Sequence, residues 1–324
     1  MLILSFDSLD SNLEVDVIVV GDGVAGISIV TLLKKEGLSV AVLEARRIGS
    51  YVTESTTAKV SYTSSLIYSR VLSQFCKEFG LKFKDAYFTG FNKIIDIVDD
   101  LNIDCDLRRI PFYILSEDET KTDMLDNELN ALKELNILAK IVNNVPCPFE
   151  KINKALVHEN QLEFTPIKYL CGLTNYIDGS FVFENSRVLD IKEVDGFKIA
   201  KTENGSVKGK NIVIATNTPI YDPDGIYKHL DQVKSHSLGI SLEKDVKDIF
   251  AVFNLFHTLR SSPSSKGEIL VFLGDHRSID NLTDRWDFYK NLRNYSQDLF
   301  NVKSFQYFWS GRDNLTPNGV TIIR

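Results

Sequence analysis

The hydrophobic pattern of the first fifty residues predicts a strand, a helix and a second strand. Val15–Val20 is a short β-branched run, typical of a strand buried on both faces. Val24–Lys35 is an apolar run that ends in two lysines, and Gly37 after it is a suitable C-terminal stop for a helix. Leu38–Leu43 is a second apolar strand. A right-handed crossover would make the two strands parallel, so this part of the chain predicts an α/β fold.

The remaining pattern alternates between helices and strands. Helices are predicted over Leu66–Phe79, Asp85–Leu101, Lys121–Leu135, Pro166–Tyr176 and Asp284–Leu299. Strands are predicted at Pro111–Leu115, within Phe181–Thr216 and Val233–Leu273, and at Phe305–Trp309. Turn signals at 194–196 and 203–205 indicate a β-meander, so the chain is α+β overall.

A glycine-rich turn joins the first predicted strand to the first helix. Gly21, Gly23 and Gly26 have the G-x-G-x-x-G spacing that permits a tight turn, a close backbone approach to a pyrophosphate and close helix packing. A helix start also offers free N–H groups to phosphates. Glu44 ends the second strand, where a carboxylate accepts hydrogen bonds from a ribose diol and repels a 2′-phosphate. These features predict a dinucleotide site, although a purely structural turn has the same spacing and the motif does not separate NAD from FAD.

Composition narrows the classes of function and location. The net charge is −7 and no Lys/Arg-rich block occurs, so nucleic acid is a poor partner. Apolar runs are too short for a transmembrane segment, and the start lacks the basic residues of a secretory signal, so we expect a cytoplasmic protein. The cysteines have no metal-binding spacing; no metal site is expected, and each is predicted to be a small buried apolar residue: Cys76, Cys105, Cys147 and Cys171.

The residues after Glu44 extend the motif into a longer pattern. Glu44–Lys59 reads EARRIGSYVTESTTAK. It resembles the D-amino-acid oxidase/glycine oxidase superfamily of FAD-dependent oxidoreductases, nearest to the bacterial branch often fused to a C-terminal Rieske domain. Further segments resemble that branch in the same order and span nearly the whole chain: Cys105–Tyr113, Gln161–Leu170, Val213–Ile220 and Trp309–Asp313.

The resemblance implies a Rossmann-like FAD-binding domain interleaved with a substrate domain on a mixed or antiparallel sheet. The FAD-binding domain would comprise residues 1–104 and 150–220, with 310–324 as the start of its C-terminal part. The substrate domain would comprise 105–149 and 221–309.

The resemblance also implies FAD as the cofactor. Val188 would meet the adenine through its backbone, Ala215 and Thr216 would lie near the cofactor, and Ser55–Lys59 would run beside the flavin. For Val188 and Ala215, a place in the strand core explains the side chain equally well. The expected cofactor-binding residues are Gly21, Gly23, Gly26, Glu44, Ala45, Arg46, Thr56, Thr57, Ala58, Lys59, Val188, Ala215 and Thr216.

The implied chemistry is oxidation of a small amine or amino acid by hydride transfer to flavin N5. An arginine fork suits a substrate carboxylate, with a tyrosine hydroxyl beside it. Arg109 and Tyr113 fit this role by their place in a family-like segment, and Arg260 and Arg312 are alternatives.

The chain departs from the family pattern at several places. Tyr51 replaces a usual glycine, and its side chain would crowd the dinucleotide or turn outward. Ser55, Thr165 and Asn217 stand where relatives often have histidine. Gly319–Arg324 resembles a family strand after which relatives continue with a flavin-facing segment; a truncated chain, a shortened gene product and a partner chain that supplies the segment are the alternatives.

Three functional hypotheses follow. The first is an FAD-dependent oxidoreductase acting on an amine or amino acid. The second is a catalytically silent remnant that binds a dinucleotide or acts as an interaction module. The third, an NAD-dependent dehydrogenase, fits less well because a single βαβ unit is followed by a β-meander rather than by a second doubly wound half.

Overall fold

A computed structural model describes residues 5–146, 149, 152, 154–177, 181–223, 225–264, 267–278 and 285–320. The chain forms two compact units. Unit 1 comprises residues 1–56, 98–105 and 166–230, and unit 2 comprises 57–97, 106–165 and 231–324. These units are compact bodies of chain and do not test where an FAD-binding domain would end, so the expected domain boundaries stay a prediction.

The sheet of unit 1 has a parallel centre and an antiparallel flank, in the order β7-β2-β1-β10-β9-β8. β1 pairs in parallel with both β2 and β10, which confirms the predicted βαβ unit. β10, β9 and β8 form the expected meander, with Asp195 and Gly196 at positive φ in the β8–β9 turn. The strands are β1 (Asn12–Val20), β2 (Val40–Leu43), β7 (Val182–Phe183), β8 (Asp190–Val194), β9 (Phe197–Lys201) and β10 (Ser206–Ile214).

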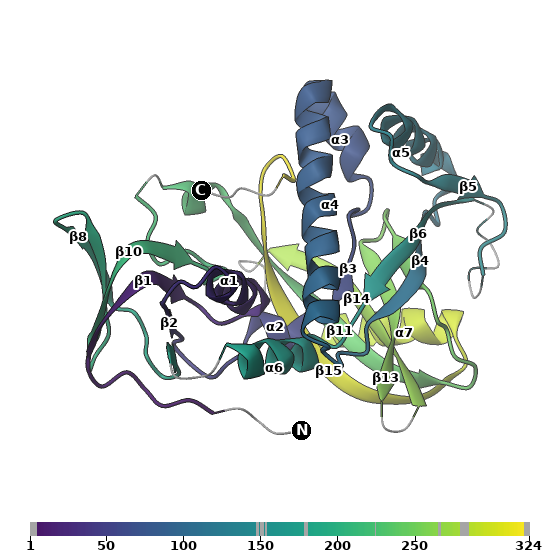
Figure 1. Cartoon of the computed structure of the whole chain (residues 1–324). Coiled ribbons are helices and arrows are strands. Elements are labelled where there is room, and N and C mark those ends of the chain that lie inside the picture. The colour runs from purple at the N-terminus through teal and green to yellow at the C-terminus, as the bar shows by residue number, and fades with distance from the viewer. Residues whose placement is uncertain are drawn as a thin grey trace. The chain divides into compact units, whose positions relative to one another are not determined.

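Apolar side chains cover both faces of this sheet. Ile18 and Leu43 belong to a cluster on one face, whereas Val40 and Val42 on the other face lie beside Val30 of α1. α1 and α6 are in contact, and Figure 1 shows both beside these strands, with α6 below α1. The helices of unit 1 are α1 (Val24–Lys35), α2 (Val52–Ser55), α6 (Pro166–Tyr176) and the short 3₁₀ helix η3 (Ile226–His229).

Unit 2 is built on a larger mixed sheet, in the order β15-β11-β14-β13-β12-β4-β6-β3, with β5 also paired to β6. Most neighbours are antiparallel, but β12 and β4 are parallel. The strands are β3 (Lys59–Val60), β4 (Arg108–Leu115), β5 (Lys140–Val142), β6 (Ala155–Glu163), β11 (Asp231–Leu242), β12 (Ile249–Val252), β13 (His257–Ser264), β14 (Gly267–Ser278) and β15 (Val302–Leu315).

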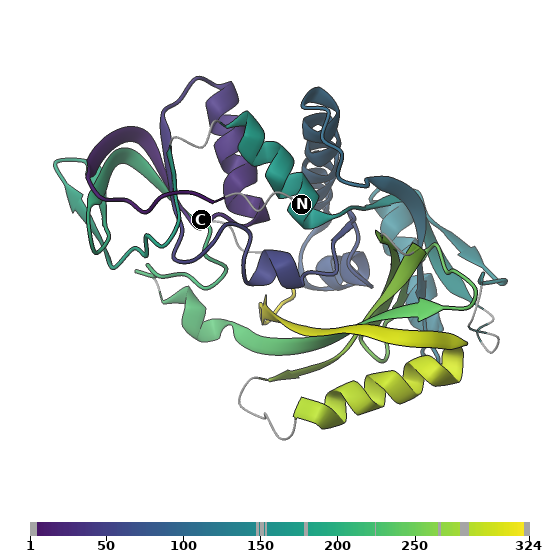
Figure 2. The ribbon, with the colours of Figure 1, turned by 90° about the horizontal axis from the view of Figure 1, so that it is seen from below.

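Alternation along β12 divides the core of unit 2 into two layers. Ile249 and Ala251 belong to a cluster with the helices α3, α4 and α5, whereas Phe250 and Val252 belong to a cluster with α7. Figure 2 shows α7 running along the sheet beside β15. The helices are α3 (Ile67–Gln74), α4 (Lys77–Asp100, whose last turn belongs to unit 1), η1 (Glu119–Lys121), α5 (Asp123–Glu134) and α7 (Arg285–Leu299). No helix in the described part of the chain combines the length and apolar composition needed to cross a bilayer.

Some local predictions were wrong. A helix was expected over 66–79, but the chain leaves the helical conformation at Phe75 and restarts at Lys77, which lets Gly80 of α4 approach Leu72 of α3 closely. Cys76 lies in this surface break and is exposed, contrary to the prediction for cysteines; Cys105 is buried as expected, Cys171 is partly exposed, and Cys147 lies outside the described residues.

β6 was not predicted because its side chains do not alternate regularly. Asn160 lies in the left-handed region with φ 57°. The pairing with β4 shifts there, since Ile110 faces Gln161 whereas Phe112 faces His158. The extra residue interrupts the period of two on which strand prediction depends.

The buried His158 of β6 predicts a loss of stability in acid. Its side chain is 0% exposed, its two ring nitrogens have no hydrogen-bond partner among the described residues, and the ring lies edge-on to Tyr62. Burial lowers the pKa of His158 from 6.5 to about 4. The unfolded chain therefore takes up the proton first, so this contribution is complete above pH 6.5 and is lost as the pH falls towards 4.

The free energy of unfolding should fall by about 3 kcal/mol between these pH values because of His158 alone. Urea unfolding of the protein and of His158→Leu, at a series of pH values, measures this term as the difference between the two curves. His229→Leu removes an exposed histidine and should keep the wild-type dependence. Parallel curves for wild type and His158→Leu would contradict the prediction.

Candidate dinucleotide site

The glycine turn lies where three strands of unit 1 end. Gly21 has φ +99°, and a Cβ there would lie 2.6 Å from the Ala215 carbonyl oxygen. A Cβ on Gly26 would lie 2.0 Å from the Gly21 carbonyl oxygen. The Gly21 N–H donates to the Leu43 carbonyl (2.9 Å), and the Ala215 N–H donates to the Val20 carbonyl (2.8 Å). Glycine is therefore required at both positions, and the backbone of β10 closes against the turn.

The start of α1 faces a hydroxyl that sequence reasoning did not select. Gly23 is the residue before the helix, and the Val24 N–H donates to Thr53 Oγ1 at 3.1 Å. A Cβ on Gly23 would lie 3.0 Å from the same oxygen. Thr53 is buried on α2, in the hydroxyl-rich stretch after Glu44. The arrangement gathers N–H donors and a hydroxyl at the positive end of a helix, where phosphate binds well.

Glu44 is held in place by backbone donors. Its Oε1 accepts from the Arg46 N–H at 2.8 Å and its Oε2 accepts from the Asp22 N–H at 3.4 Å. The side chain remains partly exposed, so free lone pairs are available to a ribose diol. Ala45 is half-buried beside it and Arg46 is exposed.

A segment distant in sequence supports Glu44 from the side. The Glu44 N–H donates to the Phe183 carbonyl (2.9 Å), and the Ser186 N–H donates to the Glu44 carbonyl (2.7 Å). Glu184, which is buried, accepts from the Ile48 N–H at 2.7 Å. Glu184 and Ser186 were not predicted, because only the folded chain brings them to the loop after β2.

Val188, Ala215 and Thr216 lie near this end of the sheet. Val188 packs against the apolar cluster that contains Leu43. Ala215 touches the glycine turn, and the Thr216 hydroxyl donates to the Thr218 carbonyl at 2.7 Å. Contact of Val188, Ala215 and Thr216 with a cofactor stays a prediction.

Asp22 is a buried carboxyl within the turn. Its side chain is 2% exposed, and its Oδ1 accepts from the Gly49 N–H at 3.2 Å. Its Oδ2 is buried and has no hydrogen-bond partner among the described residues. Burial and the nearby Glu44 carboxylate raise the pKa of Asp22 to about 8.

Tyr51 takes a backbone conformation that suits glycine. Its φ is 72° and its ψ is −110°. Its ring is 39% exposed and lies under the Arg46 guanidinium, 5.4 Å from the ring centroid. How the Tyr51 side chain lies relative to a bound dinucleotide stays a prediction.

The residues expected beside the flavin begin in unit 1 and continue into unit 2. Thr56 ends α2. In unit 2, the Thr57 carbonyl accepts from Arg260 Nε, Ala58 has φ 51°, and Lys59 donates to Thr258 Oγ1 at 2.6 Å. Burial, with Arg260 nearby, lowers the pKa of Lys59 to about 7. The flavin contacts of these residues stay a prediction.

Arg260 is committed to a buried network of charges. It lies 3.7 Å from Glu163, and both side chains are buried. Arg108 pairs with Glu163 and also with Glu268 at 2.7 Å. The charges of two arginines and two glutamates balance one another. The buried charge of Arg260 is therefore compensated without a substrate carboxylate.

The other proposed carboxylate-binding residues differ in exposure. Arg109 is exposed on β4, whereas Tyr113 on the same strand stacks on Phe250 at 5.3 Å. Arg312 is exposed on β15. Joint action of Arg109 and Tyr113 on a substrate stays a prediction.

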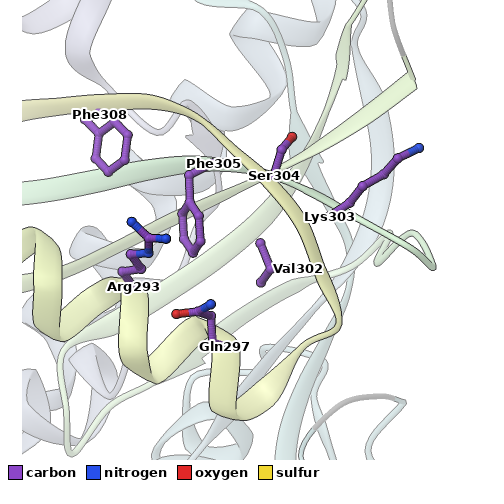
Figure 3. Close-up of a pocket in the computed structure, with 7 residues that line it drawn as sticks. All are labelled: Arg293, Gln297, Val302, Lys303, Ser304, Phe305 and Phe308. Carbon is purple, nitrogen blue, oxygen red and sulfur yellow. The ribbon is translucent and has the colours of Figure 1, made fainter.

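Unit 2 also has a surface hollow between α7 and β15. Figure 3 shows Phe305 and Phe308 pointing towards Arg293 of α7, while Lys303 extends away. The Arg293 guanidinium covers the Phe305 ring at 4.6 Å. The Phe308 ring packs against Tyr289 and Phe305, so these side chains contact one another and α7.

Comparison with known families decides between NAD and FAD. The profile of the family described as FAD dependent oxidoreductase (DAO) matches residues 16–324. The chain belongs to this family. The expected resemblance and fold class are confirmed. The expected cofactor is confirmed as well, because DAO proteins are FAD-binding flavoproteins.

Several relatives of this DAO chain are known. It is 26% identical over 328 residues to the Bacillus subtilis protein YhfW, whose name describes a Rieske 2Fe-2S iron-sulfur protein. The alignment covers 98% of this chain and 64% of YhfW. The chain is 25% identical over 227 residues to gamma-glutamylputrescine oxidoreductase of Escherichia coli, covering 67% of this chain and 52% of that protein. The chain therefore spans about half to two thirds of these relatives.

Solved structures share the fold. Glycine oxidase from Geobacillus kaustophilus has a TM-score of 0.72 at 17% identity, covering 95% of this chain and 84% of that one. L-proline dehydrogenase from P. horikoshii also has a TM-score of 0.72, at 15% identity, covering 94% and 83%.

The geometry of unit 1 fits the ADP half of FAD. The glycines let the turn, α1 and β10 approach one another closely, the start of α1 lies at this turn, and Glu44 is partly exposed with acceptors for a ribose. These residues would hold the cofactor.

The backbone of Tyr51 provides a test of this local geometry. Tyr51→Gly and Tyr51→Ala both remove the ring, but only glycine adopts positive φ without strain. We expect the glycine variant to be more stable than the alanine variant by about 1 kcal/mol, the reverse of their usual order. Chemical denaturation of both variants measures the difference, and equal stability or a more stable alanine variant would contradict it.

Proposed function

We propose that this DAO chain is an FAD-dependent oxidoreductase that oxidises an amine or amino acid by hydride transfer to flavin N5. The observation that supports the proposal best is the dinucleotide cradle, which stands in a chain matched to the family over residues 16–324. The names of relatives refer to glycine, L-proline and gamma-glutamylputrescine, all amines or amino acids, which favours that substrate class.

Each residue of the cradle would bind one part of the cofactor. Glu44 would accept hydrogen bonds from the ribose, and the N–H groups that start α1 would donate to the pyrophosphate, with Thr53 beside them. When bound, FAD supplies the acceptor for the hydride.

Lys59 would assist the substrate end of the reaction. An amine must lose its ammonium proton before its C–H bond is oxidised, and a lysine with a pKa of about 7 can accept a proton at neutral pH. Arg109 and Tyr113 would orient a carboxylate.

The alternative is a catalytically silent remnant that binds a dinucleotide or serves as an interaction module. It is supported by Tyr51 and by Ser55, Thr165 and Asn217 at positions where relatives often have histidine. A partner chain could also complete the flavin site. Reduction of bound FAD by a substrate would exclude the silent remnant.

Loss of the Glu44 carboxylate should weaken FAD binding. Glu44→Ala removes the ribose acceptor, and hydrogen bonds to a charged group contribute about 1.5–3 kcal/mol, so the Kd for FAD should rise about 10- to 100-fold. Titration of the apoprotein, followed by flavin fluorescence, measures the Kd. Glu36→Ala removes an exposed carboxylate after α1 and should bind FAD as the wild type does; an unchanged Kd for Glu44→Ala would contradict the assignment.

The carboxylate role of Arg109 can be separated from that of Arg312. With the FAD-loaded protein under anaerobic conditions, amino acids and the matching amines that lack the carboxylate are compared as reductants of the flavin. Arg109→Gln should raise the half-saturating concentration of amino acids about tenfold or more and leave that of the amines unchanged, because only the former lose a charged hydrogen bond.

Arg312→Gln serves as the matched variant, since Arg312 is also exposed and lies on β15. A selective loss in Arg312→Gln instead would transfer the role to Arg312, and no flavin reduction by either class would favour the silent remnant.

A further inference from the structure

The glycine turn carries a buried carboxyl that the proposed function does not use. Asp22 is the second residue of the G-x-G-x-x-G motif, and its side chain is 2% exposed. One oxygen accepts from the Gly49 N–H at 3.2 Å, and the other has no hydrogen-bond partner among the described residues. A buried carboxylate oxygen without a donor is costly, whereas a protonated oxygen can itself donate.

The charges that face Asp22 are negative. Glu44 lies at the end of β2 and Glu184 follows β7, and both disfavour the ionised form of Asp22. Arg46 and Arg47 of the loop after β2 are exposed, and Arg46 lies over the Tyr51 ring. The end of β10 contributes Ala215 and Thr216, which carry no charge, and Glu54 of α2 bonds to the Tyr51 N–H. The dipole of α1 is then the favourable field for an anion at this turn.

The contact between Asp22 and Gly49 is fixed by packing. Gly49 has φ +68°, and a Cβ there would lie 2.5 Å from Leu170 Cδ2 of α6. Gly49 is buried, so the loop cannot move away from Asp22 without losing this contact. Asp22 therefore links the glycine turn to the loop that carries Glu44, and its charge acts on both.

We propose that Asp22 must carry a proton for the turn to hold FAD, and that loss of the proton weakens binding of the cofactor. An ionised Asp22 would place a negative charge beside the N–H groups that receive the pyrophosphate, and would oppose the dipole of α1. The nearby Glu44 and Glu184 side chains both favour the protonated form of Asp22. The inference rests on FAD binding at this turn.

The test is the Kd of the apoprotein for FAD from about pH 6 to about pH 9.5. Since burial and Glu44 raise the pKa of Asp22 to about 8, the wild-type Kd should be flat below that value and rise up to about tenfold per pH unit above it. Asp22→Asn keeps an oxygen for the Gly49 N–H and cannot ionise, so its Kd should change by less than about threefold over the same range. Calorimetry of the wild type near pH 9, in two buffers with different ionisation enthalpies, should show proton uptake on FAD binding, and Asp22→Asn should show none.

Glu203→Gln removes an exposed carboxylate from the β9–β10 turn and should keep the wild-type profile. A wild-type Kd that does not depend on pH, or an equal rise in Asp22→Asn, would overturn this inference while leaving FAD binding intact. Failure of both the wild type and Asp22→Asn to bind FAD at about pH 6 would instead overturn the proposed function, because Asp22 is then protonated or absent.

Discussion

The dinucleotide site depends on how closely three backbone segments approach one another at the ends of β1, β2 and β10. A Cβ on Gly26 would meet the Gly21 carbonyl at 2.0 Å, and one on Gly21 would meet the Ala215 carbonyl at 2.6 Å. Only glycine permits these contacts, and they bring the start of α1 to the edge of the sheet. The turn, the helix dipole and Glu44 act as a unit because one steric constraint holds them together.

The second constraint is that buried charged groups need hydrogen-bond donors, counter-charges or protons. In unit 1, Asp22, Glu44 and Glu184 surround the loop after β2, where backbone N–H groups of Arg46, Ile48 and Gly49 are the main donors. In unit 2, Arg108 and Arg260 balance Glu163 and Glu268. The first cluster lacks a balancing cation among the groups that shift Asp22, so it must hold a proton or change with pH. The formal charges of the second cluster balance, so it needs no bound proton to be neutral.

Sequence reasoning succeeded where the signal is local. α1 begins after the glycine turn and ends at the lysines 34 and 35, and α6 begins at Pro166. Both helices therefore run where they were predicted. It failed at β6, where left-handed Asn160 breaks the alternation, and at Phe75, where packing between α3 and α4 ends a helix that the pattern would continue. In the site, Gly21 and Glu44 could be chosen by spacing, but Thr53, Glu184 and the burial of Asp22 depend on contacts between distant segments.

We propose that the turn from Gly21 to Gly26 and the carboxylate of Glu44 bind FAD rather than NAD. The most direct measurement is a titration of the apoprotein with FAD, followed by the visible flavin spectrum, with NADH added as a competitor. We expect saturable uptake of one FAD per chain and a shifted flavin band that excess NADH does not reverse. No spectral change with FAD, or displacement of FAD by NADH at comparable concentration, would contradict it.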